Sequence, residues 1–315
     1  MSTDNNFGAI KTTVAIFAFN RPNHLLNCLN SIIKNPQTNK FNFVVFVDGP
    51  RNADDAKLIK ESINVAKQFT KSLNLNIIAN EVNLGLSKSL ISGIDKVFNS
   101  VDQIIVLEDD LIVGHNFLDF MISGLERYRQ NSRVASIHGF TYDFLKQDAS
   151  SYFIRGADCW GWATWKDRWE TVEWDSRKLL ERLIELNLIS SFDLEGAYPY
   201  SNLLERQMLG KVDSWAIRWH ASMFIQNRLT LFPSRSLVEN KGFDGSGTHT
   251  KQGLDVRSYS IDEVKISKFP ELIEEDTVAL RLLIDYLRRK FYTYKRWSFK
   301  WLYWGFKRKL KWGIN

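Results

Sequence analysis

The sequence carries its strongest signal for the fold in the stretch Gln103-Ile104-Ile105-Val106-Leu107-Glu108-Asp109-Asp110. Its run of branched apolar residues is typical of a strand that is buried on both faces, as in a parallel sheet. The run stops at three consecutive carboxylates, and in open α/β sheets ligands bind just beyond the carboxyl ends of the strands. Because the three acids repel one another, we expect a cation beside them. Mg²⁺ or Mn²⁺ carrying a diphosphate fits, since these ions favour oxygen ligands, and the alternative is a solvated acidic turn.

Strand and helix patterns alternate on both sides of this stretch. Apolar, β-rich runs occur at 13–19, 43–47, 75–79 and 134–138, and helical patterns lie between them. Strands that alternate with helices predict an α/β fold with a mostly parallel, doubly wound sheet flanked by helices. The regular pattern ends near Asp143, after which the chain is Trp-rich. We therefore expect a first half at 1–143, a second half of the same domain at 144–280 and a basic, aromatic, helical tail at 281–315.

The composition indicates a protein that resides in a reducing compartment. The 315 residues include two cysteines, Cys28 and Cys159, which provide neither a disulfide framework nor the spacing of a metal site. The N-terminus is polar and lacks the apolar core of a signal peptide. No uninterrupted apolar run reaches the roughly 18 residues that a membrane-spanning helix needs. We therefore expect a cytosolic protein.

Positive charge is concentrated at the end of the chain. From Arg281 onward there are eleven Lys and Arg residues against Asp285 alone, which leaves 31 basic and 35 acidic residues in the rest. The same segment holds eleven aromatic residues. Basic residues interleaved with Trp, Tyr and Phe suit an anionic membrane surface, and we expect 285–315 to bind one. The alternatives are nucleic acid, which we do not favour as a partner, and a C-terminal helix that packs its aromatic face on the body.

Seven short motifs follow one another between about residues 12 and 250: Asn20-Arg21-Pro22, Asp48-Gly49, Asn83-Leu84-Gly85, Glu108-Asp109-Asp110, Trp160-Gly161-Trp162, Asp213-Ser214-Trp215 and Gly247-Thr248-His249-Thr250. Each motif alone is weakly specific. In this order they resemble the nucleotide-sugar glycosyltransferases of the GT-A fold. Within that group the chain is similar to bacterial family 2 enzymes and to N-acetylglucosaminyltransferase I.

The resemblance implies a metal and donor site at the carboxyl edge of the sheet. Asp110 and His249 are implied to bind Mn²⁺ or Mg²⁺, while Glu108 and Asp109 face the donor nucleotide. Such a cation neutralises the negative charge that develops on the departing diphosphate. In this interpretation residues 1–143 are the half that binds the nucleotide sugar.

Further donor contacts are implied on the neighbouring loops. Asp48 resembles the acid that hydrogen-bonds a pyrimidine base, and Asn20 and Arg21 lie where the family binds the diphosphate. The alternatives are a turn-forming aspartate and an ordinary surface arginine. Asn83 and Lys88 flank a glycine at a predicted helix N-terminus, where exposed N–H groups attract anions. A simple helix cap is the other interpretation of Asn83.

The second half is implied to bind the acceptor and to hold the base that an inverting transfer needs. Asp213 resembles that base, because relatives carry an acid just before a Trp at the start of a helix. N-acetylglucosaminyltransferase I has two acids in a row there, and Ser214 departs from that pattern. The alternative for Asp213 is an N-cap, and Asp158 and Glu205 are the other candidate bases.

The aromatic residues in and after the Trp-Gly-Trp motif suit either binding of an acceptor sugar or packing in the protein core. Sugars present apolar C–H faces, so we expect Trp160 and Trp162 to line an acceptor site by stacking. Gly161 would let the backbone approach the donor sugar. Trp165 and Trp169 are four residues apart on one helical face, which favours the core.

The resemblance implies a metal-dependent, inverting hexosyl- or N-acetylhexosaminyltransferase. The donor is a nucleotide-diphosphate sugar, of which UDP-sugar is the favoured kind. The acceptor is a glycan or a lipid-linked glycan in bacterial surface polysaccharide synthesis, which places the protein peripherally on the inner face of the cell membrane. The alternatives are a non-catalytic nucleotide- or glycan-binding relative and a sugar nucleotidyltransferase. The latter usually has a Gly-rich phosphate loop after the first strand, and 18–22 contains no glycine.

Overall fold

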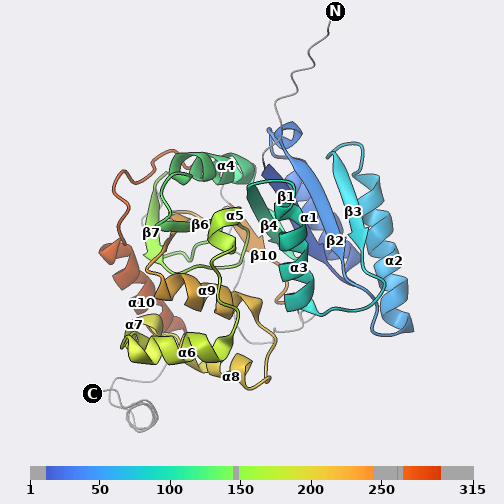
Figure 1. Ribbon diagram of the computed structural model, residues 1–315. Coiled ribbons are helices and arrows are strands. Elements are labelled where there is room, and N and C mark those ends of the chain that lie inside the picture. Colours follow the sequence, from blue (N-terminus) through green and yellow to red (C-terminus); the bar gives the residue numbers. More distant parts are fainter. Residues whose placement is uncertain (1–11, 145–148, 245–260, 262–264, 292–315) are drawn as a thin grey trace, which may run out of the picture.

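The computed structural model describes residues 12–144, 149–244, 261 and 265–291. Within these residues the main element is an eight-stranded sheet with the order β3-β2-β1-β4-β8-β6-β9-β7. From the strand pairings, all strands except β7 and β8 run in one direction. The sheet is flanked by helices (Figure 1), which confirms the predicted α/β fold with a mostly parallel sheet.

The first half of the sheet is fully parallel. Its elements are β1 (Thr12–Ala18), α1 (Pro22–Ile32), a 3-10 turn (Thr38–Lys40), β2 (Asn42–Val47), α2 (Ala53–Gln68), β3 (Leu75–Ala79), α3 (Leu86–Phe98) and β4 (Gln103–Glu108). Side chains alternate across β1, so that Val14 and Ile16 pack under α1 and α2. Ala15 and Phe17 face α3 on the other side of the sheet. A parallel strand covered on both faces explains the continuous apolar runs of the sequence.

The second half of the sheet is mixed. Its strands are β6 (Val134–His138), β7 (Ser151–Arg155), β8 (Trp162–Trp165) and β9 (Leu229–Pro233), and β5 (Leu111–Val113) pairs with β10 (Val238–Asn240) in a separate ribbon. The helices are α4 (Phe117–Tyr128), α5 (Lys166–Trp169), α6 (Ser176–Glu185), α7 (Ile189–Phe192), a 3-10 turn (Leu194–Gly196), α8 (Tyr200–Met208) and α9 (Trp215–Ile225). Strand β8 lies antiparallel between β4 and β6. This insertion joins the two halves into one sheet.

A cluster of tryptophans fills the core between α3, β8 and α9. Trp162 is 0% exposed, and its ring centroid lies 5.5 Å from that of Trp215 and 5.3 Å from that of Trp219. The prediction that Trp162 lines an acceptor site is therefore wrong, because the side chain presents no surface. Trp165 and Trp169 are also buried, which confirms their assignment to the core. The prediction that they share one helical face is wrong, because Trp165 ends strand β8 and Trp169 lies on α5, and they belong to different core clusters.

Helix α10 (Thr277–Phe291) connects the body to the basic tail. Its residues Ala279, Ile284 and Leu287 are buried against the body. The predicted tail boundary at 281 thus falls inside a packed helix. The aromatic face of the packed-helix alternative lies outside the described residues. Residues 292–315 lie outside the described residues. None of the helices in the described part of the chain is both long and apolar enough to span a bilayer.

Candidate functional site

The carboxyl ends of β1, β2 and β4 form one edge of the sheet. Phe17 on β1 is in register with Glu108 on β4, and the N–H of Asp109 donates to the carbonyl of Phe17 at 3.0 Å. On the other side of β1, the N–H of Asp48 donates to the carbonyl of Ala18 at 3.0 Å. The sheet therefore brings the acidic triplet, Asp48 and the β1–α1 turn together.

Arg21 is the cation that lies against the acidic triplet. Its guanidinium donates to both carboxylate oxygens of Asp109 and lies 2.9 Å from Oδ2 of Asp110. The side chain of Asp109 is 2% exposed, that of Arg21 is 19% and that of Asp110 is 13%. Arg21 is therefore not an ordinary surface arginine, and the expected cation beside the acids is supplied by the protein itself.

Burial changes the pKa values of the acidic triplet and of Arg21. Loss of solvent, with the charges of Asp110 and Asp109, raises the pKa of Glu108 to about 8. Burial also raises the pKa of Asp109, to about 6, against the opposing effect of Arg21. For Arg21, burial lowers the pKa, but the two aspartates outweigh it and raise the value overall. The triplet is thus an electrostatically costly arrangement that the guanidinium partly compensates.

The segment 241–244 passes directly over Asp110. The N–H of Lys241 donates to the carbonyl of Asp110 at 2.8 Å, and a Cβ at Gly242 would overlap with Oδ2 of the same residue. Farther on, Oδ2 of Asp244 lies 3.2 Å from Nε2 of His24 on α1. Pairing of β10 with β5 brings this segment to the triplet, and no local sequence pattern predicts that pairing. The metal ligand expected at His249 lies outside the described residues.

The donor set fits a divalent cation that is shared with a substrate. Within the described residues, no group of three or more His, Cys, Asp and Glu side chains could enclose an ion. Asp110 nevertheless presents hard carboxylate oxygens at a partly exposed position. Mg²⁺ is commonly held by one or two carboxylates, with substrate phosphates and waters completing its coordination. The cluster suits that arrangement and not an ion held by the protein alone.

Asp48 organises the loop between β3 and α3. Its buried carboxylate accepts hydrogen bonds from the side chains of Asn80 and Asn83 and from the N–H groups of Leu84 and Gly85, at 3.0–3.2 Å. Asn83 donates in addition to the carbonyl of Gly49 at 2.8 Å. Asn83 therefore holds the loop and is not a simple cap of α3. Base recognition by Asp48 stays a prediction, and it would have to share these oxygens.

Asp213 reaches the same loop from the second half of the chain. Its Oδ2 lies 3.4 Å from the N–H of Ser87 in the first turn of α3, although 126 residues separate the two. The N-cap of α9 is Ser214, whose hydroxyl accepts from Ile217 at 3.4 Å, so the N-cap alternative for Asp213 is wrong. Asp213 is exposed, as is the neighbouring Lys88 on α3. The predicted base and the predicted donor loop therefore meet.

The remaining predicted residues have structural partners. Asn20 donates to Oδ1 of Asp55 at 2.6 Å and so connects the β1–α1 turn to α2. Gly161 has φ = 67°, and a Cβ there would lie 2.8 Å from Cγ2 of Val238, so its lack of a side chain serves close packing. The candidate base Glu205 lies on α8.

Trp160 stands between the acidic edge and the second half. Its ring centroid is 4.6 Å from that of Phe140 and 5.6 Å from that of Phe243, which belongs to the segment over Asp110. The backbone N–H of Trp160 donates to Nε2 of His138 at 3.0 Å. The ring is partly exposed. Of the two predicted acceptor tryptophans, only Trp160 offers a surface.

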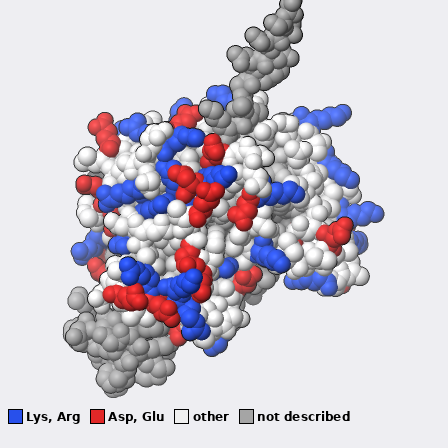
Figure 2. All heavy atoms as spheres, in the orientation of Figure 1, with Lys and Arg blue, Asp and Glu red and all other residues white. Residues whose placement is uncertain are grey.

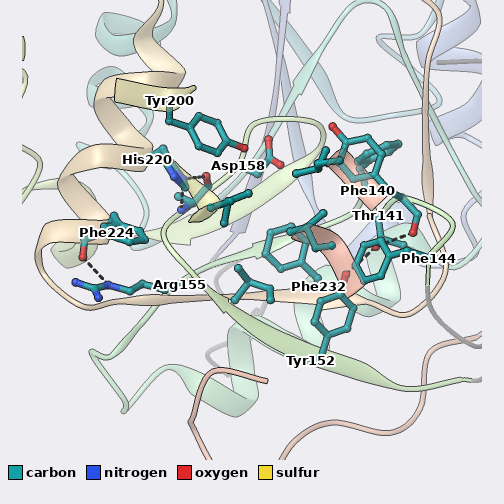
Figure 3. Close-up of a pocket in the computed structure, with 16 residues that line it drawn as sticks. Phe140, Thr141, Phe144, Tyr152, Arg155, Asp158, Tyr200, His220, Phe224 and Phe232 are labelled. Carbon is teal, nitrogen blue, oxygen red and sulfur yellow. Dashed lines mark hydrogen bonds between the residues drawn. The ribbon is translucent and has the colours of Figure 1, made fainter. Parts of the chain in front are cut away.

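Sequence reasoning missed an aromatic cavity of about 50 Å³ behind Trp160. Figure 3 shows Asp158, Tyr200 and His220 toward one end, with Tyr152 and Phe232 toward the other. Asp158 is 39% exposed, and burial followed by its charge raises the pKa of the Tyr200 phenol. The cavity is formed by residues from β7, β9, α9 and α10, which come together only in the folded chain.

Comparison with known proteins gives one clear match. The family described as "Glycosyl transferase family 2" matches residues 13–182, more than half of the chain. This part holds Arg21, Asp48 and the acidic triplet, whereas Asp213 and Gly242 lie beyond it. No curated protein matches the chain in sequence.

Several solved structures are similar at low scores. S. aureus TarS 1-349 has a TM-score of 0.43 and 13% identity, covering 74% of this chain and 60% of that one. The same protein in complex with UDP-GlcNAc has a TM-score of 0.35 and 15% identity, covering 44% and 38%. Mannosyltransferase PcManGT from Pyrobaculum calidifontis, in complex with GDP-Man and Mn²⁺, has a TM-score of 0.38 and 10% identity, covering 69% of each. The chain thus spans less than two thirds of either TarS chain, and such scores do not extend these proteins' activities to it.

Proposed function

Since the chain belongs to glycosyl transferase family 2, we propose that it transfers a sugar from a nucleotide-diphosphate donor, of the UDP type, to a glycan or lipid-linked acceptor. We further propose that the reaction is metal-dependent and inverts the anomeric centre, and that it serves surface polysaccharide synthesis. The resemblance to family 2 and the GT-A fold is confirmed, while the similarity to N-acetylglucosaminyltransferase I stays a prediction. The observation that carries the proposal is the pairing of Arg21 with Asp110 at the carboxyl edge of the parallel strands.

The donor half of the proposal rests on this edge. Arg21 offers a planar fork of N–H donors that suits phosphate oxygens. Asp110 offers a carboxylate to a divalent cation, which would supply Lewis-acid stabilisation of the departing diphosphate. The loop organised by Asp48 lies next to them and leads into the N-terminus of α3, where N–H groups favour an anion.

The acceptor half of the proposal rests on Asp213. In a single displacement, the acceptor hydroxyl attacks the anomeric carbon and gives its proton to a base as the bond to the diphosphate breaks. Asp213 is an exposed carboxylate beside the donor loop, which suits that role. Trp160 presents a ring on which the apolar face of an acceptor sugar can stack, and Asp158 is the second candidate base on that side.

We also propose that the protein works peripherally on the cytoplasmic face of the membrane, through 285–315. The support is the charge distribution of the sequence. Figure 2 shows acidic and basic side chains interspersed on one face of the body. In the sequence of 285–315, by contrast, every charged residue except Asp285 is basic. The tail is tested by truncation after Phe291, since Ile284 and Leu287 are needed for packing. Release from anionic vesicles with UDP binding retained supports the proposal, and unchanged vesicle binding contradicts it.

The reaction is tested by a screen of UDP- and GDP-sugars with Mn²⁺, in which donor hydrolysis and transfer are measured. Asp110→Asn is expected to abolish Mn²⁺-dependent turnover. The matched control is Asp102→Asn, an exposed acid before the other end of β4. Intact turnover in Asp110→Asn would refute the metal site. Donor binding without hydrolysis or transfer would favour a non-catalytic relative, and pyrophosphate release from a nucleoside triphosphate and a sugar phosphate would favour a nucleotidyltransferase.

A further inference from the structure

Oδ2 of Asp110 has two close neighbours. Nη2 of Arg21 lies 2.9 Å away, and Gly242 lies so close that a methyl group on it would overlap with this oxygen. The backbone carbonyl of Asp110 accepts a hydrogen bond from the N–H of Lys241, so the segment over it is anchored. The carboxylate that best suits a cation is therefore already paired with a cationic side chain of the protein.

Arg21 is placed so that its guanidinium can bind Asp110 and can also release it. Pro22 follows it at the first position of α1, which restricts the backbone of the turn. Its two contacts differ in burial, since Asp109 is almost completely buried and Asp110 is partly exposed. A long arginine side chain can keep the buried partner while exchanging the exposed one for a phosphate, because its fork has five donors.

We propose that Arg21 is the resident counter-ion of Asp110, and that it exchanges Asp110 for the donor diphosphate when donor and divalent cation bind together. The free protein accordingly binds divalent cations weakly, and the donor creates the cation site. This inference rests on the proposed nucleotide-diphosphate donor. It assigns to Arg21 a second role besides contact with phosphate: Arg21 makes binding of the divalent cation depend on binding of the donor.

The test compares Mn²⁺ binding without and with UDP, followed by the electron paramagnetic resonance signal of free Mn²⁺. Wild type is expected to bind Mn²⁺ weakly alone and much more tightly with UDP. The main variant is the double substitution Arg21→Gln with Asp109→Asn. It removes one positive and one negative charge, so the net charge is unchanged and the buried carboxylate of Asp109 is not left without its partner.

In this double variant, Mn²⁺ alone is expected to bind about tenfold tighter, which corresponds to an Arg21–Asp110 contact made about nine-tenths of the time. UDP binding without Mn²⁺ is expected to weaken, because a phosphate contact is lost. A merely structural role would not move the two affinities in opposite directions. Thermal unfolding of the variant shows whether the fold is retained.

Arg51→Gln is the control, because Arg51 is exposed and pairs with Asp55 in the first turn of α2 and not with the triplet. Removal of the Arg51 charge is expected to change the affinity for Mn²⁺ by no more than about twofold, since salt screens exposed charges. Equal gains in Arg51→Gln and in the double variant would overturn the inference, as would no gain in the double variant. Tight Mn²⁺ binding by wild type without UDP would overturn it and leave the proposed function standing. Absence of UDP binding in every protein would overturn both.

Discussion

Asp48 offers the sharpest test of how the donor loop is built. In Asp48→Asn, the amide oxygen can still accept the bonds that reach Oδ2 from Asn83, Leu84 and Gly85. The amide nitrogen replaces Oδ1 and then faces the donors of Asn80 and Leu84. The two bonds to Oδ1 are lost, although Leu84 keeps its bond to the other oxygen, and the remaining bonds lose their charge assistance. We expect a loss of about 2–4 kcal/mol in the free energy of unfolding.

The assay is urea unfolding together with UDP binding, with Asp54→Asn as the control. Asp54 is an exposed acid in the first turn of α2, and its substitution is expected to cost no more than about 0.5 kcal/mol. If Asp48 acts as a loop anchor, stability and UDP affinity fall together. A variant of unchanged stability that no longer binds UDP would refute this reasoning and make Asp48 a direct contact to the base.

Four further substitutions test the site and the core beside it. Gly242→Ala places a methyl group against Asp110 and is expected to weaken UDP-dependent Mn²⁺ binding; unchanged binding would show that the segment over Asp110 moves away freely. Asp213→Asn is expected to lower kcat by about 10²–10⁴ with UDP affinity retained, and equal losses in both would place it in the donor site. Trp160→Ala is expected to raise the KM for the acceptor alone. In contrast, Trp162→Ala should destabilise the fold by about 3–5 kcal/mol in urea unfolding, and a small effect would contradict its place in the core.

The sequence predicted the parts of the fold that depend on short-range pattern. The apolar runs of β1, β2 and β4 identify strands buried on both faces, and the acids after β4 follow from the end of that run. The sequence also predicted that Arg21 and Asp48 lie at the same edge of the sheet, because the carboxyl ends of parallel strands lie together. Trp165 and Trp169 are buried as predicted, but the helical spacing behind that prediction is wrong, because Trp165 ends strand β8 and only Trp169 lies on a helix.

The two tryptophans of the Trp-Gly-Trp motif show where such reasoning fails. Only Gly161 separates Trp160 from Trp162 in the sequence, yet only Trp162 is fully buried. Gly161 turns the chain with a positive φ, after which β8 enters the sheet between β4 and β6. That pairing puts Trp162 against α9, and no nearby residue encodes it.

The sequence by itself therefore determined the positions of the strands in the donor half, the acidic triplet at their edge and the charge of the tail. Only the tertiary structure decided the strand order, the pairing of Arg21 with Asp110, the approach of Asp213 to the start of α3 and the position of Gly242 against Asp110. The physical reason is the range of the interactions. Hydrophobic periodicity is local, whereas these contacts join residues about 90 to 130 positions apart. The pairing of β1 with β4, the pairing of β5 with β10 and the packing of α9 against α3 bring them together.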